Sequence, residues 1–169
     1  MIAYVTGDSH VDAIIRAKPT GFKPFILGNG SFEAEPFSSS DQKEVWFTIN
    51  DYTRNLAKNT GKQAISSDGD VWGILMGTHT ARIYRDPSWR QFEPASISQS
   101  GRQPVSDATL RDIIHADFRY IAAFFETLRK VGVSFFVISA PYPRQDHASI
   151  TRGTRKEVVR YTIKCIGTS

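Results

Sequence analysis

The sequence predicts an α/β domain, a three-layer sandwich with a mainly parallel central sheet. Four short apolar runs, rich in β-branched residues, are typical of buried strands: residues 2–6, 22–27, 70–77 and 133–140. Helical patterns separate these runs, and the runs are apolar on both faces, as in a parallel sheet covered by helices. The chain has 169 residues, of which 40% are hydrophobic, and we expect a single domain over residues 1–169.

The first part of the chain alternates strands with a short helix. The first strand ends at Gly7, and a helix is predicted over residues 10–18 because apolar side chains recur on one face: Val11, Ile14 and Ile15. The second strand ends at Gly28-Asn29-Gly30. Residues 31–49 contain two extended pieces around a Ser-rich turn, which predicts a small β-hairpin insertion.

Helices are also predicted in the later part of the chain. Residues 51–59 suit a short helix that is capped by its first Asp and closed by Gly61. The strongest helical pattern covers Ser106 to Lys130, between a Ser N-cap and Gly132. Its apolar side chains recur at steps of three and four: Leu110, Ile113, Ile114, Phe118, Ile121, Phe125 and Leu128. A last helix is predicted over residues 154–166.

Composition argues against several classes of protein. No run approaches the roughly 18 consecutive apolar residues of a membrane helix, and the N-terminus lacks the pattern of a signal peptide. Cys165 is the only cysteine, so an internal disulfide is impossible and we expect a cytoplasmic protein. The net charge of +4 comes from residues 144 onward, which we assign to a solvated helix face and not to nucleic-acid contact.

Polar residues follow each predicted strand. In such sheets the functional crevice lies beyond the carboxyl ends of the strands, and the residues there are Asp8, Ser9 and His10; Gly28 to Gly30; Gly77 to Thr80; and Pro141 to His147. Three of the four histidines fall on this edge, and we expect the fourth, His115, on the surface of the long helix. A long irregular stretch, residues 78–104, follows the third strand, and such connections are often functional.

The same residues also suit structural roles. Gly7 suits a turn, and Asp8 or Ser9 suits helix capping because both side chains accept hydrogen bonds from unpaired backbone N–H groups. His79 suits a hydrogen-bonded loop. The convergence of several such loops on one edge favours a functional site.

Gly7-Asp8-Ser9, directly after the first strand, resembles the first block of the SGNH (GDSL-like) hydrolase superfamily, and the order of elements is similar to its flavodoxin-like fold. The resemblance implies cleavage of a carboxylic ester or acetyl group, in a small-molecule ester or an acylated glycan, without a cofactor. Ser9 would be the nucleophile. Its N–H, Gly30 and His79 would form the oxyanion hole, with Gly28 a weaker candidate than Gly30. Each preorganised donor lowers the barrier by roughly 3–4 kcal/mol.

The general base is where the sequence departs from that family. The family's Asp-x-x-His block is absent after the fourth strand, and the one such spacing, Asp112 to His115, lies inside the long helix. A serine hydroxyl needs a base within reach. His147, beside Asp146, is the substitute within the chain, and His79 is the alternative. Otherwise the domain is C-terminally incomplete relative to the family, or the protein is not a hydrolase.

A metal-dependent phosphoesterase is a second hypothesis. Asp8-Ser9-His10 resembles the Asp-x-His block of calcineurin-like metallophosphoesterases, and Gly77-Thr78-His79 resembles their Gly-Asn-His block. The resemblance implies that Asp8, His10 and His79 hold a metal ion that activates water. The family's Gly-Asp-x-x-Asp block begins at Gly69-Asp70 but lacks the second aspartate, and Asp70 is predicted at the opposite edge of the sheet.

A non-catalytic, ligand-binding domain is the third hypothesis. It uses the stretch around Tyr84, where Arg82, Arg85 and Trp89 suit a pocket for an anionic or sugar-like ligand. The same three side chains are the candidate substrate-binding residues of the hydrolase hypothesis. The plain alternative is a loop whose aromatic side chains pack on the core.

Overall fold

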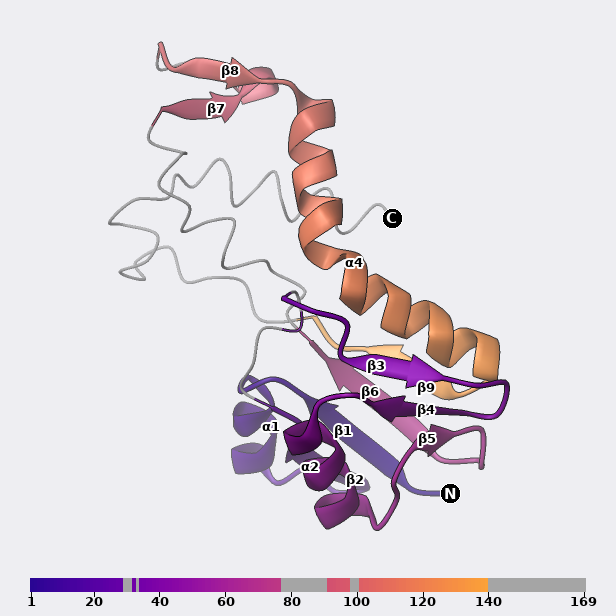
Figure 1. Cartoon of the computed structure of the whole chain (residues 1–169). Helices are drawn as coiled ribbons and strands as arrows, with labels where there is room; N and C mark the ends of the chain where they lie inside the picture. Colours follow the sequence, from indigo (N-terminus) through magenta and orange to yellow (C-terminus); the bar gives the residue numbers. More distant parts are fainter. Residues whose placement is uncertain (29–31, 33, 77–90, 98–100, 140–169) are drawn as a thin grey trace. The chain divides into compact units, whose positions relative to one another are not determined.

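The computed structural model describes residues 1–28, 32, 34–76, 91–97 and 101–139 (Figure 1). The chain divides into two compact units, one made of residues 1–77 and 119–140 and the other of residues 78–118 and 141–169. The division falls inside the long helix α4 (Asp107–Val131), whose last part belongs to the first unit.

The first unit is built on a four-stranded parallel sheet of order β2–β1–β6–β9. Its strands are β1 (Ala3–Gly7), β2 (Phe22–Ile26), β6 (Val71–Leu75) and β9 (Ser134–Val137). β1 pairs with β2 and β6, and β6 pairs with β9, each time in parallel. All four strands predicted from apolar runs are therefore confirmed.

Helix α1 (Val11–Ala17) covers one face of this sheet. Val5 and Leu75 are buried against Val11 of the helix, and partly buried isoleucines surround them: Ile14, Ile15, Ile26 and Ile138. The helix ends at Lys18 in a left-handed conformation, with φ of 47°. The predicted apolar face of residues 10–18 is thus the face that packs on the sheet.

The opposite face of the sheet is aromatic, since successive side chains of a strand point to opposite faces. Tyr4 stacks on Trp72 with ring centroids 4.7 Å apart. Phe135 of β9 stacks on Phe125 of α4 at 5.9 Å. The C-terminal part of α4 therefore covers this face.

A small antiparallel sheet and helix α2 (Asn50–Thr60) lie between β2 and β6 in the sequence. The strands of the small sheet are β3 (Ser38–Ser40), β4 (Glu44–Phe47) and β5 (Ile65–Ser66). β3 and β4 are the predicted hairpin. Asp41 accepts hydrogen bonds in its turn from the N–H groups of Lys43 (2.7 Å) and Glu44 (2.9 Å), which lowers the pKa of the Asp41 carboxyl group.

Helix α2 starts slightly earlier than predicted. Its N-cap is Ile49, so Asp51 lies within the first turn, where a negative charge suits the positive end of the helix. Gly61 closes the helix with φ of 75° and donates its N–H to Ala57 O at 2.8 Å, as predicted. An aromatic cluster joins α2 and the small sheet to α4: Phe32, Phe37, Phe47, Tyr52 and Phe124.

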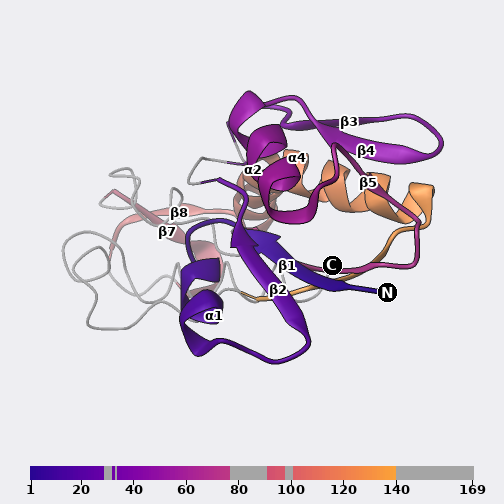
Figure 2. The same ribbon diagram turned by 90° about the horizontal axis from the view of Figure 1, so that it is seen from below.

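Helices cover both faces of the parallel sheet in the first unit (Figure 2). One face carries α1, and the other carries α2, the small sheet and the end of α4. This arrangement is an α/β fold with a parallel central sheet, and it is compatible with a three-layer sandwich.

The ends of α4 agree with the predicted signals. Ser106 Oγ accepts the Thr109 N–H at 3.1 Å, and Gly132 follows the helix with φ of 78°. The predicted apolar stripe is wrong in two places. Ile113 is exposed. Phe124 is completely buried, whereas Phe125 is only half-buried against the edge strand β9.

In the second unit, β7 (Phe92–Pro94) and β8 (Gln103–Val105) pair in parallel, and a 3₁₀ turn (Ala95–Ile97) follows β7. The prediction of an irregular stretch over residues 78–104 is therefore wrong within its described part. Each strand has only three residues, which is too few for an apolar period to appear in the sequence. Each also contains a proline, which is unusual inside a sheet.

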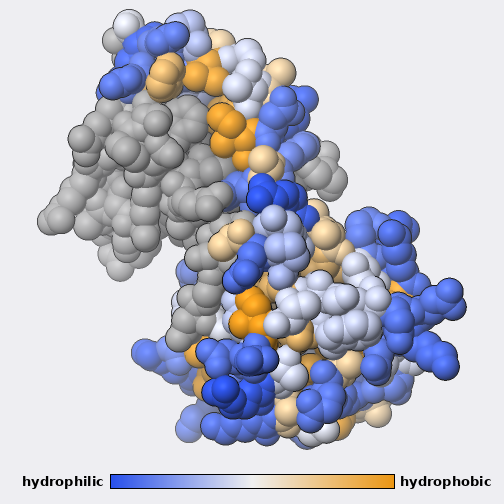
Figure 3. Space-filling view, in the orientation of Figure 1, coloured by the Kyte–Doolittle hydropathy of each residue, from blue (hydrophilic) through white to orange (hydrophobic). Residues whose placement is uncertain are grey.

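The surface of the described residues is mainly hydrophilic, with small separate hydrophobic areas on the face shown in Figure 3. The large apolar side chains that are exposed are few and scattered: Met1, Phe22, Ile113, Phe136 and Val137. In the part of the chain that the structure describes, no helix combines the length and apolar character needed to cross a membrane.

Candidate functional site

The carboxyl ends of β1, β2 and β6 are tied together around Gly7. The Gly7 carbonyl accepts the N–H groups of Leu27 (2.9 Å) and Gly28 (3.4 Å), and the Asp8 N–H donates to Leu75 O (2.9 Å). A Cβ atom on Gly7 would lie closer than 3.0 Å to the carbonyl oxygen and carbon of Leu75. Gly7 is therefore required by the close approach of two strands.

Asp8 and His10 form a side-chain pair. Asp8 Oδ1 accepts the backbone N–H of His10 at 2.8 Å and lies 2.9 Å from His10 Nδ1. The short contact between Nδ1 and Oδ1 orients the imidazole ring on this turn. A histidine oriented by a carboxylate in this way is typical of metal sites and of catalytic bases.

Ser9 is exposed between these two residues. Among the described residues, none exchanges a hydrogen bond with its hydroxyl or its N–H, while its carbonyl accepts the Asp12 N–H at 3.1 Å. Of the two predicted capping side chains, only Asp8 takes up a backbone N–H of this turn. The turn thus presents a hydroxyl and a backbone N–H together at the carboxyl edge of the sheet.

Gly28 does not suit the oxyanion role, since its N–H points to Gly7 O. It has a packing role instead, because a Cβ atom there would lie 2.7 Å from Tyr52 Cδ1. Next to it, Asn55 Nδ2 of α2 donates to Leu27 O at 2.8 Å. The preference for Gly30 over Gly28 stays a prediction.

The remaining predicted site residues lie outside the described part of the chain: Gly30, His79, Arg82, Arg85, Trp89, Asp146 and His147. Their roles in an oxyanion hole, as a base or in substrate binding stay predictions. The structure itself brings together Asp8, Ser9 and His10 on one turn.

The Asp-x-x-His spacing on α4 is a surface feature. Asp112 and His115 are both exposed, as predicted for His115. They lie on the part of α4 that belongs to the second unit.

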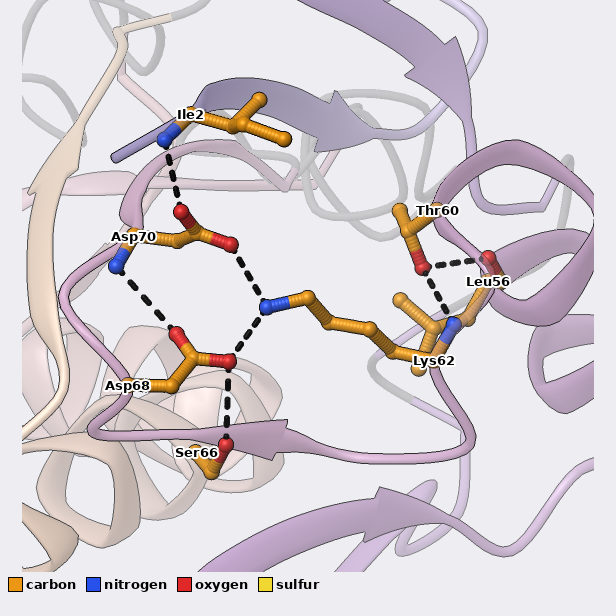
Figure 4. Close-up of polar contacts among 7 residues, drawn as sticks. All are labelled: Ile2, Leu56, Thr60, Lys62, Ser66, Asp68 and Asp70. Carbon is orange, nitrogen blue, oxygen red and sulfur yellow. Dashed lines mark hydrogen bonds and ion pairs between the residues drawn. The ribbon is translucent and has the colours of Figure 1, made fainter.

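Asp70 lies directly before β6, at the amino edge of the parallel sheet, whereas Asp8 and His10 follow the carboxyl end of β1. Figure 4 shows the polar contacts of Asp70 with Ile2 and Lys62. Asp70 accepts the Ile2 N–H at 2.6 Å and pairs with Lys62 Nζ at 2.6 Å. Lys62 also pairs with Asp68 and lies 5.8 Å above the Tyr4 ring. The position predicted for Asp70 is confirmed, and within the described ranges no group of three or more His, Cys, Asp or Glu side chains suits a metal ion.

Charge pairing shifts the pKa values in this Lys62 cluster, which consists of Lys62, Asp68 and Asp70. The hydrogen bond from Lys62 is the main reason that the pKa of Asp68 and of Asp70 is lowered. Burial opposes the charge on Lys62, but its two carboxylate partners outweigh burial and raise its pKa above 10.5. All three groups are therefore charged near neutral pH.

Comparisons of the chain with protein-family models, with curated proteins and with solved structures gave no match, and the site is interpreted from its own geometry.

Proposed function

We propose that the protein is an SGNH-type hydrolase that cleaves a carboxylic ester or acetyl group through Ser9. The observation that carries the proposal is Ser9 itself, exposed directly after β1, with no described partner for its hydroxyl or its N–H. The strand order of the parallel sheet, β2–β1–β6–β9, supports it. Counted along the chain, these are the second, first, third and fourth strands of the sheet, and flavodoxin-like folds have the same order, 2-1-3-4.

The reaction has two steps, acylation of Ser9 by the substrate and hydrolysis of the acyl-Ser9 ester by water. Ser9 Oγ bonds to the carbonyl carbon while its proton passes to a histidine base, His147 oriented by Asp146, or His79. The carbonyl electron pair moves to oxygen, where the Ser9 N–H and Gly30 donate hydrogen bonds, joined by His79 when His147 is the base. The C–O bond then breaks, and the leaving alcohol takes the proton from the base. Water attacks the acyl-Ser9 ester in the same way and releases the carboxylic acid.

His10 is not the base in this scheme. Adjacent residues of a helical turn do not face each other, and His10 Nδ1 is directed back to Asp8. The backbone N–H of His10 also donates to the Asp8 carboxylate, and His10→Ala keeps this contact in the turn that carries Ser9. Arg82, Arg85 and Trp89 would contact the substrate, a small-molecule ester or an acylated glycan, and the reaction needs no cofactor.

A fluorophosphonate, which reacts with activated serines, tests this function. We expect a single adduct on Ser9 by mass spectrometry and turnover of an aryl acetate, both lost in Ser9→Ala and retained in His10→Ala. Ser40→Ala, which changes an exposed serine of β3, is the matched control. A folded wild-type protein that carries no label on Ser9 rules the proposal out.

A metal-dependent phosphoesterase is the second candidate, favoured by the 2.9 Å contact between Asp8 and His10. His79 would be the third ligand of an ion that activates water. Here His10→Ala should abolish Mn²⁺-dependent hydrolysis of an aryl phosphodiester, and Ser9→Ala should retain it. Absence of both turnover and bound metal in elemental analysis removes this candidate. If neither variant changes the turnover of the aryl acetate or of the aryl phosphodiester, the ligand-binding hypothesis is favoured.

A further inference from the structure

We propose that Asn55, on α2, is a positioning residue that fixes the chain leaving β2 beside Gly7, at the end of β1. The inference rests on the proposed function, because this part of the chain leads directly to Gly30, the candidate oxyanion donor. Asn55 lies 28 residues from Leu27 in the sequence, and its side chain joins α2 to the end of the strand.

The Leu27 peptide is held on both sides. Its carbonyl accepts the Asn55 side-chain amide at 2.8 Å, and its N–H donates to Gly7 O at 2.9 Å. Its side chain is fully buried. The orientation of the chain after Leu27 therefore depends on α2 as well as on β1.

Tyr52 adds a steric restraint from the same face of α2, three residues before Asn55. Its ring occupies the space that a side chain on Gly28 would need, 2.7 Å (Cδ1) and 3.1 Å (Cζ) from a Cβ atom there. Tyr52 is 5% exposed and packs on Phe32 with ring centroids 5.1 Å apart. One hydrogen bond and one aromatic ring thus fix two consecutive residues.

This restraint matters for catalysis because an oxyanion donor works only when it is preorganised. A misplacement of about 1 Å in a catalytic group can cost on the order of 10²-fold in rate. The Asn55 side chain donates to the backbone of Leu27 and has no part in the proposed reaction steps, so it acts through the backbone. Its loss should change the rate of the chemical step and leave substrate binding in place.

Asn55→Ala tests the inference, with Asn59→Ala as the matched control. Asn59 is on the same helix, is exposed, and donates its amide to Asn55 O at 2.8 Å. We expect faster hydrogen exchange of the Leu27 and Gly28 N–H groups, which both donate to Gly7 O, in Asn55→Ala only. With an aryl acetate we expect kcat to fall roughly tenfold and KM to stay unchanged. Both are measured at a temperature at which each variant is fully folded.

The two readouts separate the possible failures. Unchanged exchange of the Leu27 and Gly28 N–H groups overturns the positioning role whatever the activity, and so does faster exchange with an unchanged kcat. Faster exchange spread over the whole sheet also overturns it, since that is general destabilisation. A wild-type protein without label on Ser9 overturns the proposed function, and the exchange measurement still decides whether Asn55 holds this segment.

Discussion

Gly7→Ala is expected to lower the free energy of unfolding by at least about 3 kcal/mol, among the largest effects of any single substitution in the chain. The new methyl group would overlap the carbonyl of Leu75, which is backbone and cannot rotate away. The same carbonyl accepts the Asp8 N–H, so moving it also breaks the link between β1 and β6. Denaturant unfolding followed by circular dichroism measures the loss.

Gly61→Ala is the control for this variant. Gly61 also has a backbone conformation that favours glycine, with φ of 75°, but no atom lies within 4 Å of its Cβ position. Conformational strain alone should cost roughly 1 kcal/mol there. Equal losses in the two variants would contradict the steric explanation and would mean that β1 and β6 move apart easily.

The strands and the long helix could be predicted because their patterns are long enough to recognise. Val71 to Leu75 and Leu110 to Leu128 repeat apolar side chains over several residues, and Ser106 and Gly132 mark helix ends. β5, with two residues, gives no period at all. Phe124 is buried in the core, and not Phe125 as predicted. The helical period places two consecutive residues almost equally well, so tertiary packing decides which of them is buried.

The candidate site could be predicted only where its residues are contiguous. Asp8, Ser9 and His10 follow one strand, so the end of that strand places them together. From the sequence alone, the polar side chains of Asn55 and Lys62 are expected on a solvated surface. The partner of Asn55, Leu27, lies 28 residues away, and Asp70 lies 68 residues from Ile2, so no local pattern encodes these two pairs. Asp68-Gly69-Asp70 signals a turn but does not identify Lys62 as its partner.

The second large effect is expected from Asp70→Ala at the amino edge of the sheet. Asp70 is 11% exposed, and its loss removes the acceptor for the Ile2 N–H and one of two carboxylates on Lys62. We expect a loss of roughly 2–4 kcal/mol at pH 7. Asp51→Ala is the control, because Asp51 pairs with Arg54 at an exposed position, where such pairs contribute under about 1 kcal/mol.

The effect of Asp70→Ala should also depend on pH. The pKa of Asp70 and of Asp68 is lowered by folding, so their contribution is complete above the ordinary value of 3.8 and is lost as pH falls through the folded-state values. The pKa of Lys62 is raised, so its contribution is complete below 10.5 and is lost at higher pH. The difference in unfolding free energy between wild type and Asp70→Ala should therefore be constant near neutral pH and shrink in acid. Asp41, whose pKa is also lowered, is present in both proteins and cancels in this difference. A difference that stays constant down to pH 2 would show that the Lys62 cluster stabilises the sheet by shape and not by charge.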